Sequence, residues 1–62
     1  MDFTKDTGKK FKFDVEKDGE VFHFTGVVQD GTNSQEVKFI DKFGALMRVP
    51  ADKIVFAEEV VG

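Results

Sequence analysis

Apolar and polar residues largely alternate along residues 10–28, in two runs that Asp18-Gly19 separates. An Asp-Gly pair between two alternating runs predicts a two-residue β-hairpin turn, because both turn residues need a positive φ. The resulting register places the large apolar residues on one face, pairing Phe11 with Gly26, Phe13 with Phe24, and Val15 with Phe22. A slip by one residue would set phenylalanine rings opposite charges. We therefore expect this face to point toward the core.

A second hairpin is predicted around Asp41-Lys42-Phe43-Gly44, which has the composition of a three-residue loop with a left-handed glycine. Pairing Asp41 with Ala45 sets Lys38 opposite Arg48. It also places four apolar residues on the core face: Val37, Phe39, Met47 and Val49. The polar stretch 30–34 is rich in turn formers and is expected to connect the two hairpins.

The end of the chain predicts a turn and a short last strand. Pro50 cannot donate to a strand ladder, so the fourth strand should end there. We expect a single 3₁₀ turn over residues 50–53, followed by a strand over 54–57 with Ile54 and Phe56 pointing inward. Residues 1–8 and 58–62 are expected to fray, with Phe3 as a candidate to pack beneath the strands.

Five short strands, two tight hairpins and one turn before the last strand resemble the SH3-like small barrels. The local similarity lies in Val49-Pro50-Ala51-Asp52-Lys53-Ile54, which resembles the strand–3₁₀–strand closure of that fold. The resemblance implies an all-β, five-stranded SH3-like barrel as one domain over residues 1–62, and an OB-like barrel is the alternative. The first connection is a tight turn instead of the long ligand-binding loop of SH3 domains, which argues against recognition of proline-rich peptides. Short-looped barrels include protein-binding, RNA-binding and ribosome- or polymerase-associated modules, so this fold alone specifies no function.

Composition limits the chemistry that the chain can support. It has 62 residues, 8 phenylalanines and no cysteine. The absence of cysteine excludes disulfides and thiolate metal sites. The single histidine and the carboxylates lack metal-loop spacing, so we expect no metal and no cofactor. A chain of this size is near the lower limit for independent folding, so a dense aromatic core or self-association must stabilise it.

Charge and hydropathy limit the partners and the location. Nine basic and 12 acidic residues give a net charge of -3, which disfavours nucleic acid and membrane surfaces on average. No segment has the apolar length of a membrane span, and the N-terminus has no apolar signal core, so we expect a cytoplasmic protein. No paired carboxylates or Ser/Cys–His arrangement is present, and we expect no enzyme.

An unusual set of apolar residues is predicted on the outer face of the sheet: Val21, Val27, Ile40, Leu46 and Val55. Antiparallel sheets normally keep that face polar. Bending at Gly26 could turn some of these side chains inward, or the terminal segments around Phe3 and Val60-Val61 could cover them. Alternatively, they form an interface with a partner protein or a second copy. With Phe43 at a hairpin tip as a further anchor, this set makes a protein-binding module the leading hypothesis.

The alternative hypothesis is a small barrel that binds RNA. His23 would lie near the outward basic residues that contact phosphates. These residues are Lys10, Lys12, Lys38 and Arg48. Asp14, Glu16 and Glu36 lie on nearby outward positions and interrupt this strip. The hairpin register places His23 opposite Asp14, where we expect an ordinary cross-strand pair.

Overall fold

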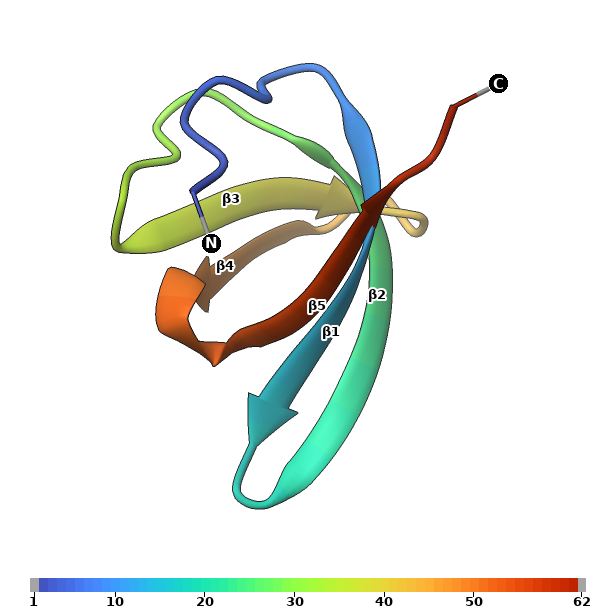
Figure 1. Ribbon diagram of the computed structural model, residues 1–62. Helices are drawn as coiled ribbons and strands as arrows, with labels where there is room; N and C mark the ends of the chain where they lie inside the picture. The colour runs from blue at the N-terminus through green and yellow to red at the C-terminus, as the bar shows by residue number, and fades with distance from the viewer. Residues whose placement is uncertain (1, 62) are drawn as a thin grey trace.

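Five antiparallel strands form one strongly curved sheet in the computed structural model, which describes residues 2–61 (Figure 1). The elements are β1 (Lys10–Lys17), β2 (Glu20–Val28), β3 (Glu36–Asp41), β4 (Leu46–Pro50), the 3₁₀ turn η1 (Ala51–Lys53) and β5 (Ile54–Glu59). The strand order is β4-β3-β2-β1-β5. The all-β class, the five strands and the 3₁₀ turn before the last strand are confirmed. The edges β4 and β5 are not joined into a closed ladder, so "barrel" describes the curvature only loosely.

The first hairpin has the register that the alternation predicts. Asp18 and Gly19 take φ values of 53° and 79°, as a two-residue turn with two left-handed positions requires. Lys17 pairs with Glu20, and the pairing continues in step to Lys10 and Val27. Side-chain alternation therefore selects the face of β1 and β2 that points inward.

The second hairpin is also confirmed, and Asp41 organises its loop. The backbone N–H of Gly44 donates to the Asp41 carbonyl over 3.0 Å. The Asp41 carboxylate accepts hydrogen bonds from the backbone N–H groups of Phe43 and Ala45, each at 2.9 Å. These bonds hold the loop without any contribution from the Phe43 side chain, which leaves that ring free to project.

Strand β2 changes partners along its length. It pairs with β1 from Glu20 to Val27 but with β3 only from Gly26 to Val28. A Cβ atom at Gly26 would lie 2.3 Å from the Phe39 ring and 2.7 Å from the Ile40 carbonyl oxygen, so β3 packs directly on the backbone there. Beyond this contact β3 turns away into the second hairpin. The first part of β2 therefore has a strand on one side only.

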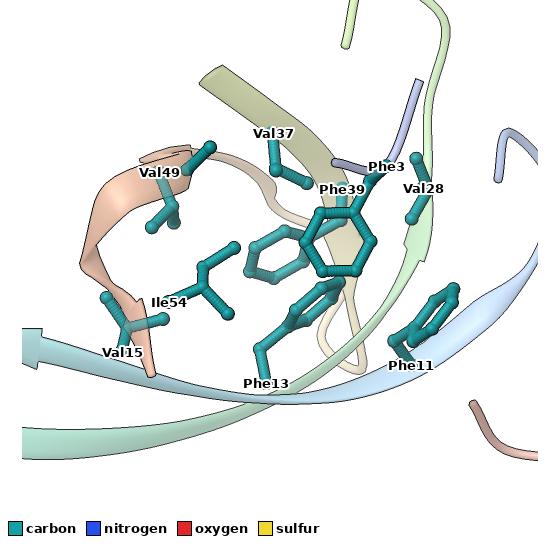
Figure 2. Close-up of a cluster of buried hydrophobic side chains, with 10 residues drawn as sticks. Phe3, Phe11, Phe13, Val15, Val28, Val37, Phe39, Val49 and Ile54 are labelled. Atoms are coloured by element: carbon teal, nitrogen blue, oxygen red, sulfur yellow. The ribbon is translucent and has the colours of Figure 1, made fainter. Parts of the chain in front are cut away.

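The core is a cluster of ten buried apolar residues, to which every strand contributes (Figure 2). The rings of Phe13 and Phe39 stack with centroids 4.7 Å apart and join β1 to β3. Phe3 is buried and meets Phe11 and Phe13 edge-on, at 5.3 and 5.4 Å. Among residues 2–61 no polar or charged residue is buried, so the core needs no internal hydrogen-bond partner.

The N-terminal segment that carries Phe3 is held to the sheet by its backbone. Gly8 donates to the Val28 carbonyl over 2.8 Å, and the Val28 N–H donates to the Lys9 carbonyl over 2.9 Å. Asp2 accepts a hydrogen bond from the Thr4 N–H, which lowers the pKa of the Asp2 carboxyl. The segment was expected to fray, but from Asp2 onward the structure describes it as turns that place Phe3 in the core.

Phe56 was predicted to point inward, and this is wrong. The pairing of β1 with β5 shifts at Asp14, because Val15 pairs with Ile54 and Asp14 pairs with Phe56. The intervening Val55 has no partner of its own, as in a β-bulge, so alternation along β5 is interrupted. Phe56 shares the outward face of Asp14 and is 50% exposed.

The last strand is also longer than expected. It continues to Glu59, and the Val60 N–H then donates to the Lys10 carbonyl over 2.8 Å. The predicted tail is thus paired with β1 as far as Val60. The cause is β1 itself, which extends to Lys10 and offers backbone partners along its full length.

Candidate protein-binding site

An open apolar groove lies between the tip of the first hairpin and the segment formed by β4 and η1. Its volume is about 520 Å³. Six side chains give it an apolar lining: Val15, Phe22, Phe24, Met47, Val49 and Pro50. Lys17, Asp18, Arg48 and Lys53 add charges of both signs along its sides. The groove is thus an apolar surface with a mixed polar border.

The groove exists because the two hairpins differ in length. Strands β1 and β2 have 8 and 9 residues, whereas β3 and β4 have 6 and 5. The tip of the first hairpin therefore extends beyond the second, as Figure 1 shows. Phe22 lies on the inner face of this extension, where no strand covers it, and 43% of it is exposed. Phe24 is half-buried, and its ring lies 6.0 Å from that of Phe39, which connects the groove to the core.

Phe22 was predicted to belong to the core, and its exposure corrects that expectation. The register was right, and so was the face. What alternation could not show is where the opposing layer ends. A signal was available in the unequal lengths of the two alternating runs, which implies that one hairpin extends beyond the other.

The same part of β2 has an unpaired backbone edge. Val28 bonds to Lys9 and Gly8 on the β1 side of the sheet, whereas the Gln29 N–H donates to the Lys38 carbonyl of β3 over 2.8 Å. Neighbouring residues of a strand direct their backbone groups to opposite sides. Counting back from Val28, the backbone groups of Val21, His23 and Thr25 point away from β1. No strand of the described chain pairs with them there.

The five predicted protein-binding residues do not form one patch. Ile40 pairs with Leu46 and with Val27, which makes a short apolar row across β4, β3 and β2 on the outer face. Ile40 is half-buried and Leu46 is exposed. Val21 lies at the start of β2 and Val55 lies in the β5 bulge, and both are exposed.

Phe43 projects from the second hairpin and is 82% exposed. The Lys42 Nζ atom lies 5.2 Å from the centre of its ring, a cation–π arrangement within the loop itself. The terminal segments leave the outer row uncovered, because Phe3 enters the core and Val61 is 84% exposed.

The predicted basic residues lie in two groups. Lys38 pairs with Arg48 on β3 and β4. Lys10 and Lys12 lie on β1, with β2 between the two groups, and Lys12 is paired with Glu58 of β5. The structure therefore brings these residues together in pairs and not as one strip.

His23 and Asp14 form the cross-strand pair that the register predicts, with 2.6 Å between Nδ1 and Oδ1. Over residues 2–61, no three histidine, aspartate or glutamate side chains gather closely enough to hold a metal ion. In that same range no helix is long and apolar enough to cross a membrane. Comparisons with protein-family models, with curated proteins and with solved structures found no match to this chain.

Proposed function

We propose that this chain is a non-enzymatic protein-binding module that acts through contacts at the groove between the first hairpin and β4. The observation that carries the proposal is the exposure of Phe22 in an apolar groove next to an unpaired strand edge. Contiguous exposed apolar surface with a polar border is typical of interaction sites. An aromatic ring at the centre of such a surface is the kind of residue that dominates binding energy.

The geometry favours an extended protein segment as the ligand. Backbone groups of Val21, His23 and Thr25 can pair with an added strand, in the manner of β-augmentation. Alternate side chains of that strand would then enter the groove beside Phe22 and Phe24. In this arrangement backbone pairing supplies affinity, and the groove selects apolar residues at every second position.

The fold supports a relation to the short-looped SH3-like barrels at the level of architecture. Two tight hairpins and η1 between β4 and β5 are the features on which that resemblance rests. The tight Asp18-Gly19 turn, where SH3 domains carry a long ligand-binding loop, supports a ligand other than a proline-rich peptide. A cytoplasmic location is part of the proposal, and a chain without cysteine is compatible with it.

Selection from a library of displayed random peptides tests this function. The protein is immobilised sparsely, so that two copies do not meet. We expect enriched peptides with apolar residues at alternate positions, because the groove lies on one face of the added strand. Phe22→Ser should weaken their binding by roughly tenfold or more. Phe56→Ser is the matched control, because Phe56 has similar exposure on the outer face, and it should leave binding unchanged.

Two results would contradict the proposal. One is a selection that enriches no peptide above the level of an unrelated immobilised protein. The other is a set of peptides that binds the Phe22→Ser variant as tightly as the original chain, which would place the contact elsewhere.

A further inference from the structure

The unpaired edge of β2 has the features of a strand that pairs with itself. We infer that the partner at this edge is a second copy of the chain, which forms a two-fold dimer through antiparallel pairing of β2 with β2. This inference rests on the proposed function and names the partner of the same site. Its support comes from the other sheet edges, from the register and from the charges at the two ends of the strand.

The two outer edges of the sheet carry features that prevent strand addition. Strand β4 is short and ends at Pro50, which cannot donate a hydrogen bond. Strand β5 has the bulge at Val55 and two consecutive acidic residues, Glu58 and Glu59, at its end. Bulges, prolines and charges of this kind are the usual protection of exposed edges.

The open stretch of β2, residues 20–25, has no such protection apart from one charge at its start, Glu20. Its sequence is Glu-Val-Phe-His-Phe-Thr, without lysine, proline, glycine or a bulge. Val21, Phe22, Phe24 and Thr25 are β-branched or aromatic, and residues of these types favour strand formation. The sheet thus protects its β4 and β5 edges and leaves the edge of β2 open, which indicates that the β2 edge is used for pairing.

Backbone alternation restricts the register of such a dimer. Residues 21, 23 and 25 point their backbone groups outward, so they must pair among themselves. Pairing must also stop before Gly26, because Asp41 of β3 is already paired there. Two registers meet the first condition, one centred on His23 and one centred on Phe22. The register centred on His23 would carry Glu20 of the second copy to the position opposite Gly26, which Asp41 occupies, whereas the register centred on Phe22 pairs residues 20–24 and avoids that overlap. It sets Phe22 opposite Phe22 of the second copy, at a position where opposing side chains approach closely.

The charges at the ends of the open stretch are complementary in this register. Glu20 begins the stretch. At its other end Lys42 lines a shallow hollow together with Lys10, Thr25 and Asp41, and the Asp41 carboxylate already accepts two backbone hydrogen bonds within its own loop. The pairing sets Glu20 of one copy opposite Phe24 of the other, and therefore next to its Thr25 and Lys42. The two-fold axis repeats the contact, so each copy supplies one acidic and one basic end. Neither residue forms an ion pair within the described chain.

Sedimentation of the intact chain is the first test. We expect its mass to rise with concentration from that of one 7.0 kDa chain to that of two. Val21→Pro should keep the protein monomeric while the β1–β2 hairpin stays intact, because it removes an N–H that points away from β1. Val55→Ser, on the protected β5 edge, should dimerise like the original chain. Circular dichroism establishes that each variant is folded.

Charge exchange tests the register without relying on proline. Glu20→Lys and Lys42→Glu should each raise the dimer dissociation constant about two- to tenfold, because two exposed pairs become like-charged contacts. The double variant should restore the original value, an outcome that a general change in net charge would not produce.

Cysteine cross-linking tests the axis directly, since the chain contains no cysteine of its own. Under mild oxidation, Phe22→Cys should form a covalent dimer at concentrations where Phe56→Cys remains mainly monomeric.

A one-chain mass at every attainable concentration would overturn the dimer. Dimerisation that Val21→Pro leaves intact would overturn this interface. Peptides that bind a strictly monomeric chain through Phe22 would leave the proposed function standing and assign the edge to another protein.

Discussion

At the residue scale, the eight phenylalanines range from fully buried to exposed, although their side chains are chemically identical. Phe13 and Phe39 are fully buried at the centre of the core, where β1 and β3 meet. Phe22, Phe43 and Phe56 are exposed because of a projecting hairpin tip, a self-supporting loop and a bulge, respectively. Position within the sheet therefore decides whether a ring stabilises the fold or is available for contact.

This division predicts different effects of the same substitution. Phe39→Ala should lower the free energy of unfolding by about 3–5 kcal/mol, because it removes a fully buried ring and leaves a cavity. In a domain of this size that loss is comparable with the total stability. Phe43→Ala should change stability by less than about 0.5 kcal/mol, since the loop is held by Asp41. Urea denaturation measures both, and equal effects would show that the Phe43 ring packs on the sheet.

At the element scale, the two turns fix the registers, and the registers fix which faces point inward. Gly19 and Asp18 bring β1 and β2 into step, and Gly26 lets β3 approach the middle of β2. Each of these positions acts through the backbone and contributes no packing of its own. The site depends on them, because the same register places Phe22 inward and His23 at the free edge.

The turn gives a prediction about backbone strain alone. A Cβ at Gly19 would meet no atom within 4 Å, yet φ is 79°. Gly19→Ala should therefore cost roughly 1–2 kcal/mol of stability through the left-handed conformation and not through a clash. Asp18→Asn is the matched control and should be neutral or slightly stabilising, because asparagine adopts this conformation readily. Thermal unfolding distinguishes them, and an unchanged melting temperature for Gly19→Ala would mean that the turn rearranges at no cost.

At the scale of the whole molecule, the sheet is open and the surface is acidic on average. The open side creates the groove and the free edge, whereas a closed ladder would remove both. The net charge of -3 disfavours a polyanionic ligand. Lys38 and Arg48, which face one another, are the strongest local exception.

This balance predicts weak or absent binding to RNA. At low ionic strength, single-stranded RNA on a column should not retain the chain, because two separated basic pairs cannot follow a phosphate backbone. Lys38→Ala, combined with Arg48→Ala, is the control variant. Retention that falls steeply with salt and is lost in that double variant would establish nucleic-acid binding as the function instead.

Sequence by itself determined the local features of this protein. Alternation of side chains, the Asp18-Gly19 turn and the Asp41 loop predicted both hairpin registers, because each depends on interactions between residues close along the chain. Pro50 marked the end of β4 for the same reason.

Only the tertiary structure decided which inward-facing side chains are covered. The β5 bulge, the burial of Phe3 and the exposure of Phe22 all depend on where distant strands end and on how they lie across one another. Alternation specifies a face, but burial requires a second layer opposite it. The groove and the free edge of β2 lie where that layer is missing, and the pattern along the chain indicates this only indirectly, through the unequal lengths of the two alternating runs.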